Sequence, residues 1–254
     1  MSSPRNAAPG SERHDLPTAE ATRRAQRIVG ATAIALGASL VIQNVMLAWV
    51  GAPGYGDPIE KVLVFHADHR VAVAIAVGSE ALNVPLLLGF VTGLYGLVGR
   101  RGGAGADWSR LAVAAGATLS AVFALYVVLW NGVALSAGDL AKPSPEFELT
   151  WQLHAAAFAM ALPALGTTFV GAALAARASR LTPRWQAVLG LVGGALLLVA
   201  GTANLAIADG SPLLFVGMPG YAAWLVWLLV TGVRLVRART AEGRDDPSAS
   251  DQDG

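Results

Sequence analysis

The sequence predicts an all-α protein, a polytopic transmembrane bundle of six helices. Hydrophobic residues make up 54% of the 254 residues and charged residues only 14%, whereas a soluble domain carries about 25% charged residues. The mean hydropathy is +0.53. The apolar residues are concentrated in six runs, each long enough to cross a bilayer at about 1.5 Å per residue, over residues 28–50, 71–98, 111–135, 151–176, 185–208 and 212–233.

The basic residues that flank these runs predict the orientation of the bundle. Thirteen arginines lie on the side of the two chain ends, whereas the other side has only Lys61, Arg70 and Lys142. Because cytoplasmic flanks carry the excess of Lys and Arg, both termini are expected in the cytoplasm. The abundance of Arg, Ala and Gly is typical of a GC-rich bacterial genome, so the bacterial plasma membrane is the expected location.

The six runs are expected to form one domain, residues 27–239, between two polar tails. Residues 1–26 and the acidic residues 240–254 cannot bury a core, so both are predicted to be disordered. The connection 51–70 begins with the turn-rich GAPGYGDP and continues as IEKVLVFHADHR, which is expected to start the second helix above the membrane. The absence of cysteine excludes disulfides, thiolate metal sites and thiol redox chemistry.

The second run contains the most informative polar group, Glu80, with Asn83 one helical turn further on. An ionisable side chain at that depth costs about 2.5–3.5 kcal/mol, so it is expected to be functional or to be paired. The membrane interior disfavours the charged carboxylate, and Glu80 is predicted to be neutral much of the time. In a continuous helix the side chains of His69 and Glu80 would point in directions about 20° apart around the helix axis. This spacing predicts one polar helix face that runs from the outer surface to the membrane centre.

Polar residues in the other runs occupy the same range of depth. All lie between the membrane centre and the outer surface, whereas the inner half holds little beyond hydroxyl groups. This pattern predicts an outward-facing polar pocket that binds a small or lipid-like ligand or a partner. The alternative is that the amides join helices without any ligand. The predicted ligand-binding residues are Gln43, Asn44, Glu80, Asn83, Asn131, His154 and Asn204.

Two further functions stay open at this point. The first is an intramembrane enzyme in which Glu80, with Asp209 as a second candidate, acts as general acid on a hydrophobic substrate, as in membrane-embedded terpene cyclases. The second is a proton-coupled transporter, although the inner half offers no strong polar path. His66, His69 and His154 are weak candidates for metal ligands, but no metal-binding signature is present, so no metal and no cofactor are predicted.

The expected partners follow from the same patterns. They are the lipid bilayer and a hydrophobic small molecule; nucleic acid is not expected, because membrane orientation already explains the arginines. The spacings Gly89-x-x-x-Gly93 and Gly190-x-x-x-Gly194 allow close helix crossings and favour packing inside the bundle over dimerisation. The sequence indicates no particular oligomeric state.

The last three runs resemble a known family. A helix opens with His154, a small-residue helix ends in arginine at 177, an LTPR turn follows at 181–184, and the chain closes with GYAAWLVWLLVTGVRL. These features resemble an uncharacterised family of six-span bacterial membrane proteins that carries only a domain-of-unknown-function label. The resemblance implies six helices and no established activity or catalytic residue.

Overall fold

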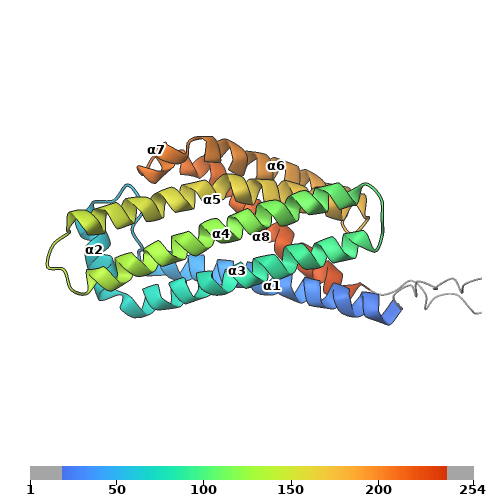
Figure 1. Cartoon of the computed structure of the whole chain (residues 1–254), viewed down its shortest axis with the longest axis horizontal. Coiled ribbons are helices and arrows are strands. Elements are labelled where there is room, and N and C mark those ends of the chain that lie inside the picture. Colours follow the sequence, from blue (N-terminus) through green and yellow to red (C-terminus); the bar gives the residue numbers. More distant parts are fainter. Residues whose placement is uncertain (1–18, 239–254) are drawn as a thin grey trace, which may run out of the picture.

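The computed structural model describes residues 19–238, and within this range the chain forms helices and no strand (Figure 1). Six of the helices are long and apolar enough to span a membrane, which indicates a multi-pass membrane protein, as the sequence predicts. The shorter α2 and α7 are the exceptions. The helices are α1 (Ala19–Trp49), α2 (Ile59–Asp68), α3 (Arg70–Gly99), α4 (Gly105–Ala137), α5 (Pro145–Ala178), α6 (Arg184–Thr202), α7 (Asn204–Ala208) and α8 (Leu214–Arg237).

The six long helices form a closed ring. Helix α1 packs against α3 and α8, α4 packs against α3 and α5, and α6 packs against α5 and α8. The start of α1, the α3–α4 loop, the α5–α6 loop and the end of α8 share one end of the bundle, on the right of Figure 1. Arginines are concentrated there, so we call it the arginine end, and we call the opposite end the α2 end.

Two boundaries differ from the expected ones. Helix α1 begins at Ala19, so residues 19–26 of the expected disordered tail are helical. This segment, AEATRRAQ, contains good helix formers, and the side chain of Gln26 is buried. Residues 1–18 and 240–254 of the expected tails lie outside the described residues. The fifth run is interrupted at Ala203, where α6 ends and the short α7 begins.

The expected continuous helix through His69 is wrong. The backbone leaves helical geometry at His69 (φ −109°, ψ 35°), so α2 and α3 are separate helices. The side chain of His69 is exposed and stacks on Phe65, with ring centroids 4.8 Å apart. The spacing of 100° per residue holds only within one helix, so it cannot be counted across this break. His69 and Glu80 therefore do not share one polar helix face.

Small residues allow the helices to approach closely inside the ring. A Cβ atom built on Gly93 of α3 would lie 2.5 Å from Cγ2 of Val29 on α1. A Cβ atom built on Gly194 of α6 would lie 2.5 Å from Cγ2 of Val170 on α5. These glycines therefore face neighbouring helices of the same chain, which confirms the expected role of the two spacings in internal packing.

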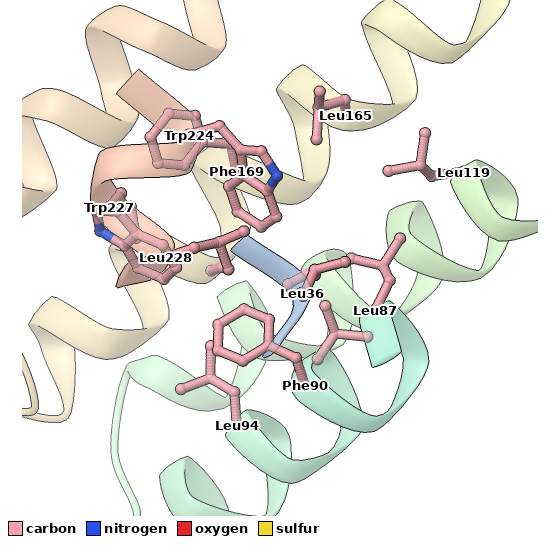
Figure 2. Packing of buried hydrophobic residues seen from close by; sticks show 14 of the residues in the cluster. Leu36, Leu87, Phe90, Leu94, Leu119, Leu165, Phe169, Trp224, Trp227 and Leu228 are labelled. Atoms are coloured by element: carbon pink, nitrogen blue, oxygen red, sulfur yellow. The ribbon is translucent and has the colours of Figure 1, made fainter. Parts of the chain in front are cut away.

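Aromatic rings fill the bundle between its centre and the arginine end. Phe169 of α5 lies edge-on to Trp224 and Trp227 of α8, with centroid distances of 5.2 and 5.7 Å. Phe90 of α3 approaches the same two indole rings from its own helix. Figure 2 shows these rings together with leucines from α1, α3, α4, α5 and α8.

Candidate functional site

A cavity of about 170 Å³ lies in the centre of the ring. Five of the six long helices line it, and α6 is the exception. Its position along the helices is between the aromatic layer and the α2 end. The lining residues that carry the argument below are Gln43, Asn44, Glu80, Asn83, Ser120, Phe123, Tyr126, Phe158, Ala161, Tyr221 and Trp224.

One part of the cavity wall is a buried cluster of a carboxyl group and two amides. Nε2 of Gln43 on α1 donates a 2.7 Å hydrogen bond to Oε1 of Glu80 on α3. Nδ2 of Asn83 donates to the other oxygen, Oε2, at 3.3 Å, and to Oε1 of Gln43 at 3.4 Å. The exposed fractions of the three side chains are 3%, 7% and 6% for Gln43, Glu80 and Asn83. Glu80 is therefore held by amide donors and is buried inside the bundle.

The carbonyl of Asn83 is not used within this cluster. Its Oδ1 atom is buried and has no hydrogen-bond partner among the described residues. A buried acceptor without a partner costs about 1–3 kcal/mol. Asn83 lines the cavity but Oδ1 itself is not exposed to it, so a donor in the cavity would reach this oxygen after the amide group turns.

A second polar contact joins α1 to α8 at the edge of the same cavity. Nδ2 of Asn44 donates to the hydroxyl oxygen of Tyr221 at 3.1 Å and to the backbone oxygen of Leu40 at 2.8 Å. Asn44 is exposed and Tyr221 is half-buried, and both line the cavity. The cavity therefore reaches the bundle surface between these two helices.

The remaining walls are apolar and rich in aromatic rings. Five aromatic side chains line the cavity, and leucines of the core cluster complete it toward the arginine end. Trp224 belongs to both the cavity wall and the aromatic layer, so the layer is the floor of the cavity. The five rings are Phe123, Tyr126, Phe158, Tyr221 and Trp224.

The structure brings together four of the seven predicted ligand-binding residues: Gln43, Asn44, Glu80 and Asn83 all line the cavity. His154 does not line it but stacks on Tyr126, which does, with ring centroids 4.2 Å apart. The other predicted residues lie elsewhere. Asn131 is exposed, Asn204 donates to Sδ of Met160 at 3.6 Å, and the catalytic candidate Asp209 is exposed where α7 ends.

Toward the α2 end the cavity is covered by an aromatic cluster around His154. The imidazole lies between Tyr126 and Trp151, whose ring centroids are 4.2 and 5.0 Å away. Both of its nitrogens are buried without a hydrogen-bond partner among residues 19–238. Tyr55, from the loop before α2, packs on Trp151 and His154, and burial raises the pKa of its phenol. This cluster separates the cavity from the loops.

His66 of α2 has both ring nitrogens engaged. Nδ1 lies 2.8 Å from the carbonyl oxygen of Val62, so it carries the proton and donates. Nε2 accepts a hydrogen bond from Nε1 of Trp130 at 3.1 Å. Burial lowers the pKa of His66, which agrees with a neutral imidazole in this arrangement. Within the described chain no three His, Cys, Asp or Glu side chains form a group that could hold a metal ion.

Several lining residues were not predicted from the sequence. Tyr126, Tyr221 and Phe158 lie in apolar runs that contain other aromatic residues, and nothing in their spacing distinguishes a cavity wall from a lipid-facing surface. The useful signal is depth. These residues lie at the level of Glu80 when each helix is measured from its α2 end.

Comparisons with known proteins place the chain in a family without a known activity. No curated protein and no solved structure matches the sequence significantly. One family model, described as a domain of unknown function, matches residues 27–232, which cover all six long helices at least in part. The chain therefore belongs to the DUF4386 family, as the resemblance of its last three helices predicts.

Proposed function

We propose that this protein binds a small hydrophobic molecule in the central cavity, with the Gln43–Glu80–Asn83 cluster holding its polar group. The observation that supports this most strongly is the combination of an apolar cavity with one buried polar wall. Ligand sites typically have this composition, with mostly apolar walls and a few convergent polar groups. The unpartnered Oδ1 of Asn83 adds an acceptor that a ligand donor would satisfy once the amide group turns toward the cavity.

The alternative functions have less support. An intramembrane enzyme could use Glu80 as a general acid in the same cavity, but Asp209 is not among the lining residues and would not assist it. A proton-coupled transporter needs a polar path to the opposite side. Here the aromatic layer around Phe169, Trp224 and Trp227 lies between the cavity and the arginine end, where such a path would have to run. We therefore favour binding over chemistry or transport.

We also propose that the arginine end faces the cytoplasm of a bacterial cell, so that the cavity lies in the outer half of the plasma membrane. The support is the excess of arginine at that end. Because the chain has no cysteine, single cysteines at Ala104, which is exposed beside the start of α4, and at Ser144 report sidedness directly. In intact cells a membrane-impermeant maleimide is expected to label the cysteine at 144 and not the one at 104. Labelling of the cysteine at 104 alone would mean that the orientation is the opposite one.

Retention of an endogenous ligand tests the binding function. Ala161 of α5 is 4% exposed and lines the cavity, so Ala161→Phe is expected to fill part of the space. Ala156→Phe is the matched control, because Ala156 lies on the same helix and is exposed. Mass spectrometry of organic extracts from purified protein should find a specific molecule in wild type and in Ala156→Phe, and at least a tenfold smaller amount in Ala161→Phe.

Two results would contradict the binding function. One is that all three proteins release the same bulk phospholipids and nothing else. The other is that a specific molecule is retained equally by Ala161→Phe. Size-exclusion chromatography and thermal unfolding of each variant distinguish loss of the ligand from loss of the fold.

A further inference from the structure

We propose that the cavity selects a protonated amine with a small apolar body and that Glu80 is its counter-ion. This inference rests on the proposed function, because it names the chemical class of the ligand for the same cavity. It follows from three properties of the wall: Glu80 has no cationic partner among the described residues, the cluster around Glu80 offers a ligand more acceptors than donors, and aromatic rings line the rest of the cavity.

Glu80 has no cationic partner in residues 19–238. Its hydrogen-bond partners are the neutral amides of Gln43 and Asn83, and the two ion pairs of the described chain lie elsewhere, at Asp57–Lys61 and Asp107–Arg110. An ionised carboxylate accepts about four hydrogen bonds, and these amides supply two. A buried carboxylate is costly unless a cation and further donors compensate it. A ligand ammonium supplies both the charge and the N–H donors.

The cluster also offers acceptors rather than donors to a ligand. The Nε2 group of Gln43 and the Nδ2 group of Asn83 are directed to Glu80, whereas Oδ1 of Asn83 is free. Ser120, which also lines the cavity, donates its hydroxyl to the backbone oxygen of Gly116 at 2.8 Å. At this cluster a ligand carbonyl or carboxylate would therefore meet like groups, and the hydroxyl of Tyr221, which accepts from Asn44, is a donor only at the edge of the cavity. An ammonium with several N–H donors fits this wall.

The aromatic walls favour the same class of ligand. Five rings, including the indole of Trp224, line a space of about 170 Å³. The faces of such rings attract cations, most strongly for tryptophan. A cavity of about 150 Å³ is large enough for benzene. The expected ligand is therefore a single ring or short chain that carries one ammonium group.

The test uses three probes of nearly equal shape and different polarity. Benzylammonium is a cation with N–H donors, benzyl alcohol is a neutral donor, and ethylbenzene has neither property. Binding to the full-length protein in detergent at neutral pH is followed by calorimetry and by the tryptophan fluorescence, to which Trp224 in the cavity wall contributes. Wild type is expected to bind benzylammonium at least tenfold more tightly than either neutral probe. Glu80→Gln should weaken benzylammonium at least tenfold and change the other two less than threefold.

The other outcomes each lead to a definite decision on the amine assignment. If a neutral probe binds wild type as tightly as benzylammonium, and Ala161→Phe abolishes that binding, the cavity is a ligand site for neutral molecules. If none of the probes binds and extracts hold no specific molecule, the proposed function fails as well. If Glu80→Gln does not fold, the ranking of the three probes in wild type decides the assignment by itself.

Discussion

Replacing Phe169 with alanine is expected to lower the free energy of unfolding by about 3–5 kcal/mol. The ring of Phe169 is fully buried against the indoles of Trp224 and Trp227. Helix α6 makes room for it with glycine, since a Cβ atom on Gly193 would lie 2.7 Å from Cε1 of the ring. Deleting the ring therefore leaves a cavity, and the residue of α6 that faces it is a glycine with no side chain to fill it.

The measurement is reversible unfolding in mixed micelles of a mild and a denaturing detergent. Phe215→Ala is the control, because this phenylalanine is 72% exposed and its truncation creates no internal cavity. Its effect is expected to stay within about 0.5 kcal/mol. Equal effects of the two substitutions would mean that α5, α6 and α8 do not pack around Phe169 as described.

Replacing Gly232 with valine is expected to separate α1 from α8 and to destabilise the protein by about 3 kcal/mol or more. A Cβ atom at Gly232 would lie 2.7 Å from the carbonyl oxygen of Gly30 and 3.1 Å from the backbone nitrogen of Ile34. Overpacking typically costs about 1–3 kcal/mol when side chains can move aside. Here the obstacle is backbone, so one helix has to shift as a whole.

Gly78→Val provides the matched control for this interface. Gly78 lies on α3, and a Cβ atom there would meet nothing within 4 Å. The unfolding midpoint of Gly78→Val should match or exceed that of wild type, because valine forms helices better than glycine does. A Gly232→Val protein as stable as the control would contradict the α1–α8 crossing.

The sequence predicted the parts of the site that depend on one helix. Glu80 and Asn83 are three residues apart on α3, and this spacing by itself puts their side chains within hydrogen-bond distance. The depth of Gln43 also follows from its distance to the end of its run. The break at His69 could not be predicted in this way, since IEKVLVFHADHR has no glycine or proline that marks the end of a helix.

The partner of Glu80 could not be chosen from the sequence. Gln43 and Asn131 lie at similar distances from the α2 ends of their helices, yet Gln43 donates to Glu80 and Asn131 is exposed. The difference arises because α1 and α3 are neighbours in the ring and Gln43 lies on the side of α1 that faces α3. The sequence of a run does not indicate which helix packs beside it or how far the helix is rotated about its own axis.

By itself the sequence determined the six spans and the depth of each polar residue, because burial in lipid requires long apolar helices whatever their arrangement. Only the tertiary structure decided which helix faces point inward. The physical reason is that lipid and the bundle interior are equally apolar, so hydropathy does not distinguish the two sides of a membrane helix. Close packing at residues such as Gly30 and Gly232, and the hydrogen bonds of Glu80, fix the rotations that create the cavity.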